Sequence, residues 1–317
     1  MLRAVDEFTP EACETARMDM HAGLLAVSAV TVRALTDKQF PQWRELPLLR
    51  LSTSGTVHEI FRLGTGLSAR FRLQVDDAEV VWSQVRAEAD AARELVGRTR
   101  FATPRPVAIG APGRDYPMPW LVQTWLEGTA AIGADTGESI LLARDLAELV
   151  SDVRSIETRG RRYKGYGRGG ALSDHDEWIQ QCLAQGEGLL DTDVLRRIWE
   201  AMRDLPRGDS PDVMNHGDLL PGNLLVHQGR LTGVLDVGGL TPADPALDLV
   251  SAWHLFEAQP RRVMRECLDT DAEEWERGKA WAFQQALGAV WYYVDSNPAF
   301  SQMGRRTLER ITADSVR

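Results

Sequence analysis

The sequence predicts an α+β fold in which a small, antiparallel β-rich part precedes a larger, mainly helical part. Between Leu48 and Leu73, apolar residues alternate as they do in strands, and Gly55, Gly64 and Gly66 interrupt the alternation as hairpin turns require. Beyond about residue 138, the apolar residues recur mainly at helical spacing. With 317 residues and 44% hydrophobic content, the chain is long enough to bury a sizeable core.

The β-rich part also contains two expected helices. A Thr9-Pro10 cap begins the first, and Gly97 closes the second. We expect these helices at 9–34 and 77–97, and two further strands at 106–109 and 120–125. The pattern predicts two domains, residues 1–126 and 127–317.

The second part is predicted to be helical apart from one hairpin. Its strands, 224–226 and 231–235, flank a turn at 227–230. Asp244 followed by Pro245 marks a helix start, with an N-cap and a proline at the first position. The glycine- and arginine-rich stretch 160–170 is the most loop-like internal segment. The expected helices are 138–156, 174–186, 191–204, 244–258, 271–294 and 299–313.

The composition and net charge limit the kinds of partner that the protein is expected to bind. A formal charge of -10 and a pI near 5.2 argue against nucleic acid, because a protein that binds phosphate backbones needs a basic stripe. The acidic balance is compatible with a cationic small substrate. No coiled-coil seam is evident, so we expect a monomer.

Cysteine use and hydropathy point to the cytoplasm. Cys13, Cys182 and Cys267 are far apart and odd in number, so we expect them to be reduced and buried. The apolar stretch from Gly23 to Val32 is too short to cross a bilayer and lacks the basic start of a signal peptide, so we expect no membrane association.

One run of residues contains the candidate catalytic and metal-binding side chains. Asp218 and Asn223 lie on a single loop, where Pro221 and Gly222 favour a turn and would present both side chains into one cleft. Asp236 ends the second strand of the predicted hairpin and can face Asn223 across it. A carboxylate and an amide oxygen suit Mg²⁺. Each residue alone could be a turn or strand-opening residue, but together they indicate phosphoryl transfer, which needs mainly positioning and charge neutralisation.

These motifs resemble the aminoglycoside phosphotransferase family, specifically an actinobacterial-type branch of it. The resemblance rests on HGDLLPGN at 216–223, VLDVGG at 234–239 and the segment 244–249. It extends to 39–43, 61–64, 116–128 and 281–297, and covers most of the chain from about residue 36. It implies a protein-kinase-like bilobal fold, with a small sheet-containing N-lobe and a larger helical C-lobe.

The resemblance assigns roles in the larger lobe. Asp218 would orient the acceptor hydroxyl, and Asn223 and Asp236 would hold magnesium. His216 and Asp248 would support the catalytic loop structurally.

In the smaller lobe the resemblance places a basic residue on the third strand and a glutamate on the helix after it. Arg70 and Glu88 fall at these positions. Arg72 shares the strand face of Arg70 and is an alternative phosphate ligand. The run that contains Gln123 and Trp125 would be the hinge that meets the adenine edge of ATP or GTP, or else an ordinary central strand.

The implied function is that of a small-molecule kinase, which transfers the γ-phosphoryl group of ATP or GTP to a hydroxyl of an aminoglycoside or another antibiotic. A metabolite kinase for an amino alcohol, sugar or natural-product intermediate is one alternative. A non-catalytic nucleotide-binding relative is another, although the complete set of chemical groups argues against it. Leu220, Val237 and the turn at 54–59 depart from the family pattern without removing a group that the chemistry needs.

A polycationic acceptor would require acidic residues in the larger lobe. The candidates are Asp174, Asp176, Glu177, Asp269, Asp271, Glu273 and Glu274, and solvated helix faces are the ordinary explanation for them. The aromatic residues Trp178, Trp253, Trp281, Trp291, Tyr292 and Tyr293 recur at helical spacing, for which core packing is the default and a wall for a flatter acceptor the alternative.

Overall fold

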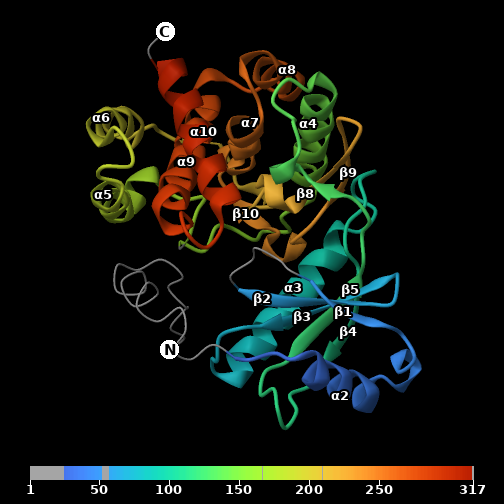
Figure 1. The fold of residues 1–317 in the computed structure, drawn as a ribbon. Helices are drawn as coiled ribbons and strands as arrows, with labels where there is room; N and C mark the ends of the chain where they lie inside the picture. Colours follow the sequence, from blue (N-terminus) through green and yellow to red (C-terminus); the bar gives the residue numbers. More distant parts are fainter. Residues whose placement is uncertain (1–24, 52–56, 166, 209, 316–317) are drawn as a thin grey trace. The chain divides into compact units, whose positions relative to one another are not determined.

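The computed structural model describes residues 25–51, 57–165, 167–208 and 210–315 (Figure 1). The chain divides into two compact units by its contacts. The first comprises the residues up to Val96 together with Thr103–Glu127, and the second comprises Gly97–Ala102 and the chain from Gly128 onward. Unlike the predicted division after residue 126, this one gives the short segment 97–102 to the second unit, where the Ala102 N–H donates to the Thr232 carbonyl.

The first described helix of the first unit is α2, Ala29–Gln39. Ser28 caps it by accepting a hydrogen bond from the Thr31 N–H at 3.0 Å. The helix predicted at 9–34 lies largely outside the described residues, and within them α2 starts later and continues further than expected. It ends at Phe40 because a residue before proline disfavours the helical conformation, and Pro41 follows.

A five-stranded antiparallel sheet follows α2, with the strand order β1-β2-β3-β5-β4. The strands are β1 Leu48–Arg50, β2 His58–Leu63, β3 Leu67–Arg72, β4 Pro106–Gly110 and β5 Trp120–Thr124. The strands predicted in this part are therefore confirmed. The turn predicted at Gly55 lies outside the described residues.

Alternation along β3 separates core residues from candidate ligands. Ala69 and Phe71 are buried, and Phe71 stacks on Trp120. Arg70 and Arg72, which point to the opposite face, are only partly buried. That face meets α3, Ala78–Leu95, which begins where the Asp77 carboxylate accepts hydrogen bonds from two N–H groups of its first turn.

The second unit is mainly helical, and its two longest helices, α9 and α10, pack along each other (Figure 1). The helices are α4 Ile140–Arg154, α5 Asp176–Gln185, α6 Thr192–Met202, α7 Val250–Leu255, α8 Ala258–Leu268, α9 Ala272–Tyr292 and α10 Pro298–Ser315.

The prediction of one continuous helix at 244–258 was wrong in detail. The segment is a 3-10 helix, η6 at Pro245–Leu249, followed by the short α7. Phe256 then adopts an extended conformation, and α8 begins after it, which the sequence did not predict. Pro260 obscured this helix, yet proline is tolerated in a first turn because its missing N–H would have no partner there.

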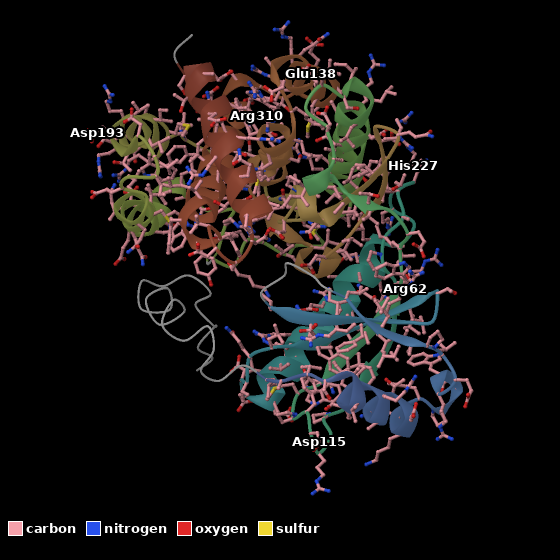
Figure 2. The ribbon with its side chains drawn as sticks, viewed as in Figure 1. Arg62, Asp115, Glu138, Asp193, His227 and Arg310 are labelled. Atoms are coloured by element: carbon pink, nitrogen blue, oxygen red, sulfur yellow. The ribbon has the colours of Figure 1, made fainter. Side chains whose placement is uncertain are left out.

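Two small sheets complete the second unit. One has the order β6-β8-β9, with β6 at Thr129–Ala130, β8 at Leu224–His227 and β9 at Arg230–Val234. The β8–β9 hairpin is as predicted, and its turn places Gln228 and Gly229 at positive φ, 49° and 71°. His227 lies at this turn and is exposed (Figure 2). The other sheet pairs β7, Val213–Asn215, with β10, Thr241–Ala243, and neither strand was predicted.

The indole rings predicted to be core residues are buried. Trp253 and Trp281 have no exposed surface, and Trp178 and Trp291 are also buried. Of the two cysteines described, both free, Cys182 is buried and Cys267 is exposed on α8, so the expectation of burial was wrong for Cys267. In the part of the chain that the structure describes, no helix is long and apolar enough to cross a membrane.

Candidate functional site

The loop after β7 carries the candidate catalytic residue. Strand β7 ends at Asn215, and the chain continues through His216 and Gly217 to Asp218. Gly217 has a φ of 82°, a left-handed conformation that glycine adopts without a steric penalty. The sharp turn brings the Asp218 side chain to a position where 34% of it is exposed.

Asp248 supports the backbone of this loop through two hydrogen bonds. It lies in η6, is fully buried, and accepts hydrogen bonds from the backbone N–H groups of His216 at 2.7 Å and Gly217 at 2.9 Å. Burial raises the pKa of Asp248, while the two backbone donors and the Arg154 charge oppose that effect. Asp248 therefore lies where the prediction of a structural role for it requires.

His216 is buried and bonded through both ring nitrogens. Its Nδ1 accepts from the Asp218 N–H at 3.3 Å, so Nε2 carries the proton and donates to the Leu235 carbonyl at 3.0 Å. One imidazole thus links the loop that carries Asp218 to the end of β9. Its position agrees with the predicted supporting role.

Asp218 and Asn223 are brought together, as predicted. The Asn223 amide nitrogen donates to Oδ2 of Asp218 at 2.8 Å and to its backbone carbonyl at 2.9 Å. Pro221–Asn223 forms the 3-10 turn η4, which shortens the path between the two side chains. Because the amide nitrogen faces Asp218, the amide oxygen is the group left to face a cation.

Asn223 and Asp236 flank the open end of the β8–β9 hairpin. The Leu235 N–H donates to the Asn223 carbonyl at 2.7 Å, and Asp236 follows directly. Asp236 has φ 54° and ψ 48°, a left-handed conformation that costs a non-glycine residue on the order of 1–3 kcal/mol and is concentrated at functional sites. Aspartate is among the residues that tolerate it best.

An amide oxygen and one carboxylate fit magnesium. Mg²⁺ keeps several waters and is bound through one or two carboxylates together with substrate phosphates, so a full protein cage is unnecessary. Accordingly, the described residues contain no group of three or more His, Cys, Asp or Glu side chains placed to hold a metal ion. The donor set of Asn223 and Asp236 is thus compatible with the predicted ion.

A partner of Asp218 was missed by sequence reasoning. Arg168, from the glycine-rich stretch 160–170, places Nη2 3.3 Å from Oδ1 of Asp218. The two residues are 50 positions apart, and no local pattern predicts that a loop returns to Asp218.

Sequence reasoning also missed a buried ion pair between Asp244 and Arg277. Asp244 caps η6 as predicted, accepting from the Ala246 N–H at 2.9 Å. Its carboxylate also binds Arg277 of α9 through two hydrogen bonds, at 2.9 and 2.5 Å, and accepts from the Trp281 indole at 3.3 Å. Both charged side chains are almost completely buried, so this pair anchors the start of η6.

In the first unit, Arg70 and Glu88 line one small pocket. Arg70 approaches Nδ1 of His58 at 3.4 Å. Arg72 lines the same pocket, and its guanidinium binds the side-chain oxygen of Gln84 on α3. The structure thus brings the two alternative phosphate ligands together with Glu88.

The predicted hinge begins where β5 ends. Gln123 is paired within the sheet, opposite Ser68 on β3. The Trp125 N–H donates to the Gly66 carbonyl at 2.8 Å. Within the described residues, the next two N–H groups, of Leu126 and Glu127, donate no hydrogen bond to another backbone group. The strand alternative therefore holds for Gln123, and the segment after it has backbone groups available for a ligand.

The comparison with known protein families shows which family the chain belongs to. The model of the phosphotransferase enzyme family, APH, matches residues 49–281, which is well over half of the chain. The chain belongs to this family. The matched range includes every predicted site residue of the chain.

Known relatives agree with this membership. An aminoglycoside 3'-phosphotransferase of Escherichia coli is 27% identical over 148 residues, or 44% of this chain, and the match spans only 53% of that relative's length. Among solved structures, the GDP and kanamycin complex of APH(2")-IIia has a TM-score of 0.67 at 16% identity, covering 90% of this chain and 99% of that one. The macrolide 2'-phosphotransferase of Brachybacterium faecium has a TM-score of 0.58 at 18% identity, covering 86% and 97%. The predicted α+β, kinase-like fold is therefore confirmed.

Several acidic residues considered for a polycationic acceptor have structural partners in this protein. Asp176 accepts from the Trp199 indole at 2.8 Å and pairs with Arg203. Two others lie in the first turn of α9 or just before it. There Asp271 caps the helix, and Glu274 pairs with Arg154 at 2.6 Å.

Proposed function

We propose that this phosphotransferase is a magnesium-dependent kinase that transfers the γ-phosphoryl group of ATP or GTP to a hydroxyl of a small molecule. The proposal rests on one observation above all: Asp218, Asn223 and Asp236 are held at adjacent positions by the turn η4 and the β8–β9 hairpin. Phosphoryl transfer needs little from a protein beyond such positioning and charge neutralisation.

In this mechanism Asp218 orients the acceptor. Its Oδ2 is fixed by Asn223, so Oδ1 is the oxygen that can accept a hydrogen bond from the hydroxyl. As the new oxygen–phosphorus bond forms, the hydroxyl proton passes to Asp218. His216 and Asp248 act indirectly by fixing the backbone that carries this carboxylate.

Asn223 and Asp236 would hold the metal. When bound, Mg²⁺ supplies positive charge that neutralises the triphosphate. The orientation of the Asn223 amide supports this role, because both of its recorded donor contacts go to Asp218 and its oxygen is left for a cation.

The nucleotide would be held mainly by the first unit. Arg70, which lines the same pocket as Glu88, would bind the phosphates, and Arg72 remains the alternative ligand. The backbone after Gln123, around Trp125, would meet the base edge. Solved relatives were obtained with GDP and, for APH(2'')-Ib, with ADP, which supports a purine nucleotide and leaves both donors in consideration.

The acceptor that the relatives favour is an antibiotic. Their names include aminoglycoside and macrolide phosphotransferases. A metabolite kinase is the second candidate, and a specific observation favours it: Arg168 lies beside Asp218, while Asp176 and Glu274 are already paired. These charges suit a polycationic acceptor less well than a neutral one.

A coupled assay for nucleoside diphosphate release tests the proposal. ATP and GTP would be supplied separately with magnesium and a panel of aminoglycosides, macrolides and hydroxylated metabolites. Acceptor-dependent release is expected, and Asp218→Ala should abolish most of it while leaving nucleotide binding nearly intact. Asp236→Ala should instead weaken magnesium-dependent nucleotide binding.

Asp193→Ala is the matched control, since this exposed aspartate lies in the first turn of α6 (Figure 2). Near-normal turnover in Asp218→Ala would contradict the assignment. Nucleotide binding without turnover on any acceptor would instead favour a binding protein.

A further inference from the structure

Arg168 sits on a loop whose path is fixed. Gly167 and Gly169, on either side of it, have positive φ angles of 74° and 105°. The Gly167 carbonyl accepts from the Tyr163 hydroxyl at 2.6 Å, and the Gly169 carbonyl accepts from the Asp244 N–H at 3.0 Å. Hydrogen bonds to the two flanking glycines thus fix the backbone on both sides of Arg168.

Close packing also restricts this loop. A Cβ atom on Gly169 would lie 2.5 Å from the Cβ of Ala243, and one on Gly170 would lie 2.6 Å from the ring of Tyr163. The Tyr163 N–H in turn donates to Asp212 at 2.8 Å. A side chain at either position would force its neighbours to shift, so close packing favours glycine there and restricts the path of the backbone next to Arg168.

The contact with Asp218 is single and long. One N–H of Arg168 approaches Oδ1 at 3.3 Å, whereas charge-assisted hydrogen bonds are typically about 2.7–2.9 Å. The side chain is 29% exposed, and this is its one recorded hydrogen bond within the described residues. The rest of the planar guanidinium is therefore available to a second anionic group beside the catalytic carboxylate.

We propose that Arg168 is a catalytic residue that binds the phosphoryl group while it passes to the acceptor hydroxyl. This inference rests on the proposed function. In the reaction the bond between the γ phosphorus and the β–γ bridging oxygen breaks, the acceptor oxygen bonds to phosphorus, and the hydroxyl proton goes to Asp218. The negative oxygens of the transferred group must then lie next to Oδ1 of Asp218, where Arg168 presents its remaining N–H groups.

Charge supports this arrangement. The same loop places Arg168 near His175, and burial together with the Arg168 charge lowers the pKa of that histidine. A neutral imidazole does not compete with the guanidinium for an anion. A cation kept 3.3 Å from a carboxylate also relieves the repulsion that an incoming phosphoryl group would meet at Asp218.

The alternative is that Arg168 only orients Asp218, and a double-mutant cycle separates the two roles. Steady-state turnover with the acceptor found in the panel would be measured for the parent, Arg168→Gln, Asp218→Ala and the double variant. If Arg168 binds the phosphoryl group, Arg168→Gln should lower kcat by about 10²- to 10³-fold in the parent and lower the residual rate of Asp218→Ala again. No further loss in the Asp218→Ala background would overturn the proposal.

Further variants and a binding measurement complete the test. Arg168→Lys, which keeps the charge but not the planar fork, should recover part of the lost rate. Arg162→Gln removes the same charge from an exposed position of the same loop and should behave like the parent. Calorimetric titration with MgADP should give the same affinity for Arg168→Gln as for the parent, and an unchanged unfolding midpoint is expected.

Loss of MgADP binding or of stability in Arg168→Gln would overturn the proposal in favour of a structural role. Failure of the proposed function looks different: the parent itself would show no acceptor-dependent release, or Asp218→Ala would turn over normally.

Discussion

The amide nitrogen of Asn223 lies 2.8 Å from Oδ2 of Asp218, so the proposed metal ligand is oriented by the proposed catalytic carboxylate. A second bond to the Asp218 carbonyl, at 2.9 Å, uses the same nitrogen. Neither side chain can rotate without disturbing the other. The two roles are therefore coupled through one amide group.

Asn223→Asp tests this coupling. The substitution keeps an oxygen ligand but removes both donors and sets one carboxylate against another. We expect turnover to fall by about 10²-fold or more, a loss typical of disturbing one preorganised group. Rates at saturating magnesium would be compared with those of Asn223→Ala. An Asn223→Asp variant with parental turnover would show that the amide donors do not matter.

Asp248→Asn probes the support of the catalytic loop. The new amide would place an N–H₂ group against one of the two backbone N–H donors that Asp248 now accepts, leaving a buried donor unpaired. We expect a loss of about 1–3 kcal/mol in the free energy of unfolding. Turnover should fall while nucleotide affinity is kept, as measured by urea denaturation and calorimetry. Asp193→Asn is the control, and equal stabilities would count against the bracing role.

The sequence could place the proposed catalytic residues close together because their spacing is local. Asp218 and Asn223 are five positions apart, and the two-residue turn of the hairpin fixes where Asp236 falls. The alternation of the first sheet was readable for the same reason. Short-range geometry leaves few ways to arrange such residues.

Contacts between distant segments could not be predicted in this way. Arg168 meets Asp218 across 50 positions, and Arg277 meets Asp244 across 33. The strands β7 and β10 have three residues each, too few for an alternation to be recognised. The sequence pattern did not reveal α8 because Pro260 lies in the first turn of this helix.

The buried pair of Asp244 and Arg277 should be a main source of stability in the second unit. Arg277→Met leaves a carboxylate that is 1% exposed without its cation, which typically costs about 3–5 kcal/mol. Combining it with Asp244→Asn should cost less than the sum of the two single changes. Urea denaturation of the single and double variants measures this coupling. Arg197→Met, an exposed arginine on α6, is the control, and additive losses would contradict the prediction.

Arg70 and Arg72 can be separated by truncating each in turn. Both arginines line the pocket that contains Glu88, and the resemblance to the family pattern places the phosphate ligand at Arg70. Arg70→Met should therefore raise the KM for the nucleotide by about 10- to 100-fold, the value of a charged hydrogen bond. Arg72→Met should change it little. The reverse order in steady-state titrations would transfer the phosphate-binding role to Arg72.

His254 should make the protein less stable in mild acid. Burial lowers its pKa to about 4 from an ordinary value of 6.5, while the hydrogen bond with Gln285 opposes this shift and the Arg168 and Arg310 charges add to it. Its ring joins three helices, since Nδ1 lies 3.0 Å from the Thr307 hydroxyl and Nε2 lies 3.0 Å from Oε1 of Gln285. A neutral ring carries one N–H, so it donates either to Oε1 of Gln285 or to the Thr307 oxygen, whose own proton goes to the Met303 carbonyl at 2.9 Å.

The sign of the pH effect follows from proton binding. Between pH 6.5 and about 4 the unfolded chain holds a proton on His254 that the folded protein excludes, so stability falls as the pH falls through this window. From about pH 7.5 to about pH 5 the contribution should be a loss of about 2 kcal/mol. Urea denaturation at both pH values would measure it. His254→Gln should remove most of this dependence, whereas His227→Gln, at an exposed turn, should leave it unchanged. A His254→Gln variant with the parental pH dependence would show that other groups control acid stability.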